Sequence, residues 1–475
     1  MKNIKNLSKY TLMVWAFLTM SSCKDFLDIN VDPTLKSDIT LQELLPTVQF
    51  YTGETSYSFA FTACQYVQQI GSNTAGGLLD AQAESENGGG WTNFYINVIP
   101  HVNLMITKGQ EQNAPGYVGI AKVLLAYNMG IATSAWENIP VSQSDKGLEK
   151  NFAPTFDSQE AVYANIQKTL DEAIIELAKS GTKPSTDDLI YGGDLTKWTK
   201  AAFTLKARYA MHLTKKGATK AATDALAAIQ KGFTSNDDDF QLGYNSRNLS
   251  PWYSRVALAN TTGNLSITHS NTLISAMNAN ADPRLPIIAT LRRNQTVYTG
   301  VTPGRGSGAT VDFGITNWHS RVTSPIVFAT FAEAKALEAE ARFILNGGNL
   351  TSTGSTQAAY DAYLAIAQSN MTRLGVAASE ITRYQTRANV AVTPARLTLS
   401  LILAEKYKAM FLIGDIWNDA RRYDYVFLTL PEQHNVELKG LWIQRLRYPV
   451  TEQTRNSEIT KQNFKAPTDV MWAFK

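Results

Sequence analysis

The chain has 475 residues and a formal charge of +3. Three lysines lie within its first nine residues, so the remainder is close to neutral and contains no basic block. This pattern argues against nucleic acid or a strongly anionic surface as a partner. The 9 Trp and 20 Tyr exceed what a core usually needs, and both residue types favour surfaces that are part apolar and part wet.

The N-terminus predicts a secretory signal peptide over residues 1–22. The early lysines precede an apolar stretch at 10–20, which the small residues Ser21 and Ser22 follow. Cys23 comes next, which indicates a bacterial lipobox with Cys23 as the acylated first residue of the mature chain. Met20 departs from this pattern, because such boxes prefer leucine there. The alternative is a plain signal peptide followed by a chance cysteine.

Acylation of Cys23 would anchor the rest of the protein to a membrane. Each buried CH₂ group contributes about 0.8 kcal/mol, so several acyl chains hold a protein firmly. No later segment is expected to cross a membrane. Cys64 is then the only free cysteine, which excludes an internal disulfide and predicts a small buried residue.

Residues 23–40 show little periodicity and are predicted to form an extended tether. From 41 to 216 the pattern is helical. Asp157 or Ser158 is placed to cap one of these helices. Its apolar stripe repeats at steps of four and three residues and consists of Val162, Ile166, Leu170, Ile174 and Leu177.

The amino-acid composition changes over residues 217–324, which are rich in Asn, Gly, Ser and Thr. Such composition predicts loops punctuated by turns. A loop region of this length is either functional or disordered. Its aromatic residues favour an ordered, functional region.

Helical pattern returns at 325–425. We expect helices at 331–345 and 358–374, and a third with Thr393 as its N-cap and Pro394 at its first position. Residues 426–475 are irregular. The body is therefore predicted to be mostly α, built from helix pairs at 41–216 and 325–425, with the loop-rich segment as an inserted subdomain.

Seven segments, taken in order, resemble motifs of the SusD/RagB family. Among them are Asp-Pro-Arg at 282–284 and Glu-Lys-Tyr at 405–407. One departure is Trp-Glu-Asn at 136–138, where Phe-Gly-Asp is commoner in the family. The segments are residues 23–33, 126–140, 193–208, 282–285, 330–342, 404–422 and 447–456.

The resemblance implies a SusD-like domain over residues 41–475, with tetratricopeptide-like helix pairs in a right-handed solenoid and a variable loop subdomain. It also implies a non-catalytic lipoprotein of the outer membrane, exposed at the cell surface and without a cofactor. Such a protein sits over a SusC-like TonB-dependent transporter. It captures oligosaccharides, or in some members peptides, and passes them to the transporter.

Ligand binding is expected from aromatic residues on loops, because a flat ring stacks on the apolar face of a sugar. Nearby amides can then read hydroxyl groups. Trp91 is the leading candidate, since a tryptophan behind three glycines has little local reason to be buried. The alternative for each candidate is ordinary packing of a loop onto the body. The predicted ligand-binding residues are Asn87, Trp91, Tyr95, Trp252, Tyr253, Asn317 and Trp318.

Charged residues inside apolar helical patterns are predicted to form buried ion pairs, because an unpaired buried charge is costly. These residues are Arg208, Glu340, Glu405, Arg421 and Arg422. Tryptophans inside helical patterns are predicted to be core. These are Trp136, Trp198 and Trp417.

Evidence for an enzyme is weak. The five histidines are dispersed without metal-ligand spacing, and there is no Gly-x-Ser-x-Gly elbow or phosphate loop. The acidic runs at 187–188 and 237–239 are predicted to be solvated loops, and neither a metal nor a calcium site is predicted. The sequence leaves three functions open: oligosaccharide capture, peptide capture, and a surface hydrolase with two facing carboxylates.

Overall fold

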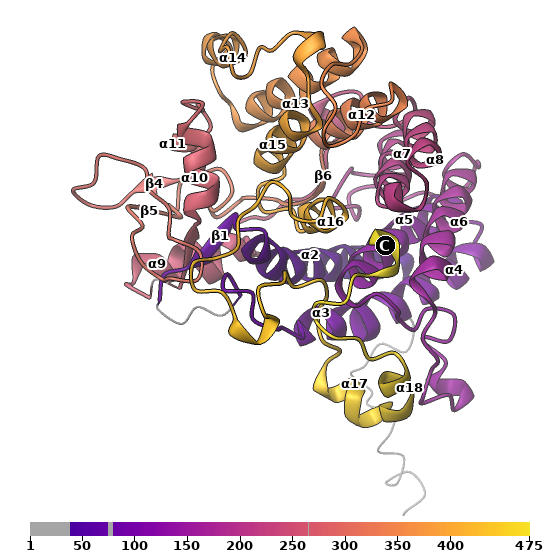
Figure 1. Ribbon diagram of the computed structural model, residues 1–475. Coiled ribbons are helices and arrows are strands. Elements are labelled where there is room, and N and C mark those ends of the chain that lie inside the picture. The colour runs from indigo at the N-terminus through magenta and orange to yellow at the C-terminus, as the bar shows by residue number, and fades with distance from the viewer. Residues whose placement is uncertain (1–38, 75–78, 265) are drawn as a thin grey trace, which may run out of the picture. The chain divides into compact units, whose positions relative to one another are not determined.

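Helices make up most of the computed structural model, which describes residues 39–74, 79–264 and 266–475 (Figure 1). The predicted signal peptide, Cys23 and most of the tether lie outside the described residues. The prediction of a mostly α protein is confirmed. The longer helices are α2 (Leu41–Tyr66), α4 (Ile99–Glu111), α5 (Pro115–Trp136), α6 (Gln159–Leu177), α7 (Leu195–Met211), α8 (Thr214–Ile229), α12 (Phe331–Leu345), α13 (Gln357–Leu374) and α15 (Leu399–Ala409).

Short helices and strands complete the chain. The short helices are α3 (Gly88–Thr92), α9 (Leu258–Thr261), α10 (Asn271–Asn278), α11 (Leu285–Ile288), α14 (Ala378–Gln385), α16 (Ile416–Arg422), α17 (Val450–Arg455) and α18 (Ser457–Gln462). The strands are β1 (Ile70–Ser72), β2 (Phe240–Leu242), β3 (Ile267–His269), β4 (Thr290–Leu291), β5 (Val311–Asp312) and β6 (Ile326–Ala329).

Helix α5 lies at the centre of the core and packs against α2, α4, α6 and α7. By length and hydropathy it could cross a membrane, contrary to the expectation that no segment after the signal peptide is long and apolar enough. Its apolar window is 89% buried inside the protein, as in a core helix. Gly130 allows α7 to approach, because a Cβ there would lie 2.1 Å from the Tyr209 hydroxyl oxygen.

Consecutive helices pack as pairs, notably α5 with α6, α7 with α8, and α12 with α13 (Figure 1). The Ser158 hydroxyl accepts a hydrogen bond from the Ala161 amide and begins α6, as one of the two predicted caps. Helix α12 occupies the predicted residues, and Gly375 ends α13 in the left-handed conformation with φ 80°.

Two helix boundaries differ from the prediction. Helix α8 continues to Ile229, into the segment expected to be loop-rich, because its alanines favour helix. Residues Pro394–Arg396 form only one 3₁₀ turn, and the Thr393 side chain makes no cap hydrogen bond. Helix α15 begins later, where Thr398 accepts a hydrogen bond from the Leu401 amide.

The described residues form three two-stranded antiparallel sheets. Strand β1 of the helical body pairs with β3, and β2 pairs with β6. Strand β4 pairs with β5 inside the loop-rich segment, together with α9, α10 and α11 (Figure 1). The first two sheets tie the loop-rich segment to the helical body.

Candidate functional site

Trp91, the leading candidate, is buried. Its side chain is 6% exposed and packs edge-on against Trp136, with ring centroids 5.0 Å apart. The glycines before it begin helix α3, and the Trp91 amide donates to the Asn87 carbonyl, so the run is helical and turns the ring inward. The expectation that Trp91 stands free is therefore wrong. Tyr95 lies against Trp91 at 4.5 Å and is half-buried.

Trp252 is also buried, with 3% of its side chain exposed. Its ring stacks between Phe61 and Phe313, with centroid distances of 6.4 and 6.1 Å. Tyr57 meets it edge-on at 4.9 Å. Trp252 thus packs against Tyr57 and Phe61 of α2 and offers no free ring. The expectation that Trp252 is exposed is wrong. Tyr253 is half-buried and begins a π-helical turn.

Asn317 and Trp318 hold a loop together. The Asn317 Oδ1 atom accepts from Thr290 Oγ1 at 2.9 Å and from the Gly314 amide at 2.5 Å. Asn317 is buried, so its amide is used internally. Trp318 is half-buried, and the Arg373 guanidinium covers its ring at 4.3 Å. Ligand contact by this pair stays a prediction.

A cavity of about 390 Å³ lies beside Asn87, and we call it the α2 pocket. Helix α2 supplies one wall and the turn before α3 supplies the other. Its described lining residues are Tyr57, Ser58, Phe61, Thr62, Leu79, Ser85, Asn87, Gly88 and Gly89. None of these carries a charged side chain.

The α2 pocket offers the half-buried ring of Phe61, next to the buried Tyr57, and several hydrogen-bonding groups. Tyr57 and Phe61 lie one helical turn apart with ring centroids at 6.1 Å. The Ser58 hydroxyl donates to Asn87 Oδ1 and thereby orients the amide. Gly88 is open, since a Cβ there would meet no atom within 4 Å. A ligand can therefore approach the backbone closely at this edge.

An ion pair borders the same pocket. Arg255 Nη2 lies 2.6 Å from Glu54 Oε2, and the Arg255 guanidinium carbon lies 5.0 Å from the Tyr57 ring centroid. Burial raises the pKa of Tyr57, so its phenol stays protonated and can donate a hydrogen bond. The structure thus brings Asn87 together with Trp252 through Tyr57 and Phe61.

Sequence reasoning missed Tyr57 and Phe61. The only signal was an aromatic pair four residues apart on a predicted helix, which is also the spacing of an ordinary core stripe. Nothing in the sequence placed Asn87 opposite that helix.

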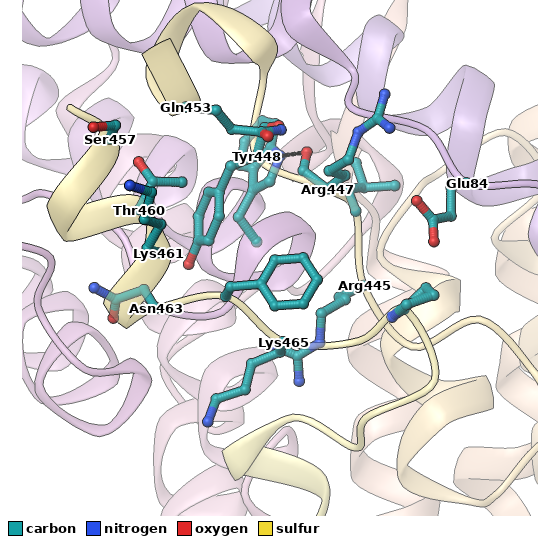
Figure 2. Close-up of a pocket in the computed structure, with 14 residues that line it drawn as sticks. Glu84, Arg445, Arg447, Tyr448, Gln453, Ser457, Thr460, Lys461, Asn463 and Lys465 are labelled. Carbon is teal, nitrogen blue, oxygen red and sulfur yellow. Dashed lines mark hydrogen bonds between the residues drawn. The ribbon is translucent and has the colours of Figure 1, made fainter. Parts of the chain in front are cut away.

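A second cavity, of about 340 Å³, lies near the C-terminus, and we call it the C-terminal pocket. Figure 2 shows Ser457, Thr460 and Asn463 on one side of it and Glu84 on the other. Tyr448 and Trp136 contribute to its buried wall, whereas Phe464 is 64% exposed.

Comparisons with known proteins agree with this architecture. The family model described as "Starch-binding associating with outer membrane" (SusD-like) matches residues 33–449. No curated protein matches the sequence.

Solved structures resemble the chain over most of its length. A SusD homolog from Bacteroides uniformis has a TM-score of 0.77 at 19% identity, covering 92% of this chain and 100% of that chain. A chitin-binding protein has a TM-score of 0.76 at 22% identity, with 91% and 99% covered. A chitin-binding SusD homolog from Flavobacterium johnsoniae has a TM-score of 0.75 at 20% identity, with 92% and 98% covered. The likeness to these structures shows a shared fold, and because the family model spans most of the sequence, the chain belongs to the SusD-like family.

Proposed function

We propose that the protein captures neutral oligosaccharides in the α2 pocket, without cleaving them, and delivers them to a SusC-like TonB-dependent transporter. The observation that carries this proposal is the described lining of that pocket. It combines the half-buried ring of Phe61, packed beside the buried Tyr57, with hydroxyl and amide groups, and its described residues include no charged side chain.

Such a lining suits a sugar. The C–H faces of a pyranose ring pack on aromatic rings, and its hydroxyl groups pair with amide and hydroxyl side chains. A neutral ligand also avoids the cost of burying an unpaired charge. The volume of about 390 Å³ falls within the range of small-molecule sites. Asn87 keeps its predicted role, and Trp252 acts by supporting Phe61 and Tyr57.

The family description and the names of two neighbours suggest starch and chitin fragments as first ligands to try. Anchoring through Cys23 and exposure at the cell surface are part of the proposal. They rest on the lipobox and on the family's described association with the outer membrane.

Isothermal calorimetry with purified protein tests the ligand class. The panel contains malto-oligosaccharides, chito-oligosaccharides and a pool of short peptides, and each saccharide is recovered afterwards for product analysis. We expect saturable binding of at least one saccharide series, with the saccharide recovered intact. Binding of peptides alone would favour the peptide-capture alternative, and shortened saccharides would favour the hydrolase.

A further inference from the structure

The α2 pocket and the C-terminal pocket share a wall. The wall is the segment 84–87, which has no regular secondary structure. Glu84 lines the C-terminal pocket, whereas Ser85 and Asn87 line the α2 pocket. Neighbouring residues of this short segment therefore line two different cavities.

The shared wall is held firmly. The Arg447 amide donates to the Ser85 carbonyl at 2.9 Å, and the Val450 amide donates to Glu86 Oε2 at 2.7 Å. Trp136 Nε1 lies 3.3 Å from the Glu86 carbonyl and 3.2 Å from the Arg447 carbonyl. These contacts fix the separation of the two cavities, so a ligand that engages both meets a preorganised pair of sites.

The C-terminal pocket has the features of a sugar subsite. Phe464 lines this cavity and is 64% exposed, so much of its side chain is accessible to a ligand. The turn that carries it is anchored, because Asn463 accepts from Asn138 Nδ2 at 2.9 Å and donates to the Ile459 carbonyl at 2.9 Å. Ser457 adds a hydroxyl group to the lining. Unlike the α2 pocket, this cavity also carries charged side chains, which are Glu84, Arg445, Arg447, Lys461 and Lys465. An open ring beside hydroxyl and ammonium donors suits a polyhydroxylated ligand.

We propose that the C-terminal pocket is a second subsite for the same glycan chain, so that one oligosaccharide crosses the 84–87 wall and contacts both cavities. This inference rests on the proposed function, because it takes the ligand to be a glycan. Short oligosaccharides fill the α2 pocket alone, and longer ones gain affinity from Phe464. Tethering two contacts on one ligand raises affinity without tightening either contact by itself.

The test is calorimetry with malto- and chito-oligosaccharide ladders from the disaccharide to the octasaccharide. Phe464→Ala is compared with wild type and with Phe152→Ala, which removes another exposed ring, 75% exposed, that lines neither cavity. We expect Phe464→Ala to weaken binding of the longest bound oligosaccharide by roughly three- to tenfold, the share of one aromatic stacking contact. Binding of the shortest bound oligosaccharide should be unchanged, and Phe152→Ala should match wild type throughout.

The outcomes separate this inference from the proposed function. If wild type and Phe464→Ala bind saccharides of every length equally well, the C-terminal pocket is not a second subsite. That result would not affect the proposal of capture in the α2 pocket. Equal losses at all lengths would also overturn it, since Phe464 would then belong to the primary site. A wild-type protein that binds neither ladder would overturn both proposals. Melting temperatures within a few degrees of wild type establish that the variants are folded.

Discussion

At the scale of single residues, the interior contains a set of paired charges that join distant helices. Arg208 Nη2 lies 2.5 Å from Glu333 Oε2, and Arg422 Nη2 lies 2.7 Å from Glu340 Oε2. Arg284 Nη2 lies 2.6 Å from Glu405 Oε1. These residues are almost fully buried, and pairing meets the requirement that a buried charge be neutralised.

Arg421 departs from the prediction that it forms an ion pair. Among the described residues it has no carboxylate partner within salt-bridge distance. It donates instead to the carbonyls of Ser134 at 2.7 Å and Gln444 at 2.8 Å, and its guanidinium carbon lies 3.8 Å from the Trp417 ring centroid. Burial lowers the pKa of Arg421 to about 10, so it remains charged at neutral pH.

Glu340→Gln should strongly destabilise the protein, because it leaves two buried cations, Arg422 and Lys406, with Asp419 as their shared carboxylate. Removing one partner of a buried pair costs about 3–5 kcal/mol. Urea denaturation of the two proteins measures the free energy of unfolding. The matched control is Glu380→Gln, which removes an exposed pair with Arg383 and should cost about 1 kcal/mol or less. Equal effects of the two changes would contradict this account.

His269 makes stability depend on pH. It is fully buried, its ring centroid lies 4.2 Å from that of Phe313, and its Nε2 atom lies 2.9 Å from the Ile288 carbonyl. Burial lowers the pKa of His269 to about 3. The unfolded chain has an imidazole pKa of about 6.5 and binds a proton first as pH falls. The contribution of His269 is therefore present above about pH 6.5 and is lost as pH falls toward about 3.

His269→Gln should remove this acid sensitivity while keeping a donor for the Ile288 carbonyl. Between about pH 6.5 and 4.5, wild type should lose about 2–3 kcal/mol more unfolding free energy than the variant. Urea titrations at the two pH values measure this difference. Parallel losses in both proteins would show that His269 does not carry the effect.

At the scale of elements, apolar periodicity followed by a clear stop predicted helices well. The helical pattern at 331–345 ends before Gly347 and Gly348, and α12 occupies those residues. The start of α15 was predicted wrongly because two threonines compete for the cap position. Thr393 with Pro394 matches the capping pattern locally, but the chain extends at Leu397 before α15 begins after Thr398.

Thr398→Ala should cost about 1 kcal/mol of unfolding free energy, the usual contribution of an N-cap hydroxyl. Thr393→Ala should change it by less than about 0.5 kcal/mol, since its hydroxyl makes no cap hydrogen bond. Urea denaturation of both variants compares the two threonines directly. If Thr393→Ala lowers the unfolding free energy more than Thr398→Ala does, Thr393 is the N-cap, as the sequence predicted.

At the scale of the whole molecule, the sequence predicted the helical body, but it did not predict the α2 pocket that Asn87 lines. The pocket forms where Tyr57 and Phe61 of α2 lie opposite the turn before α3. No local sequence pattern predicts that these two segments come together. The burial of Trp252 has the same origin, because its neighbours Phe61 and Phe313 come from distant segments. Local propensity therefore predicts elements, whereas long-range packing decides which rings face solvent.

The proposed membrane attachment through Cys23 also concerns the whole molecule. Cys23→Ala should abolish incorporation of radiolabelled palmitate and move the protein from the outer-membrane fraction to the soluble fraction, because the acyl chains supply the anchoring energy. Cys64→Ala is the matched control and should leave both unchanged, since Cys64 is buried. If wild-type protein incorporates no radiolabelled palmitate, the prediction that Cys23 belongs to a lipobox is wrong.

Capture in the α2 pocket is tested most directly by titrating Phe61→Ala and Phe50→Ala with the saccharide that wild type binds most tightly. Both phenylalanines lie on α2, but only Phe61 lines the pocket. We predict that Phe61→Ala weakens binding about tenfold or more, as expected for loss of an aromatic contact of about 1.4 kcal/mol, while Phe50→Ala binds like wild type. Full affinity in a folded Phe61→Ala protein would place the ligand elsewhere and contradict the account.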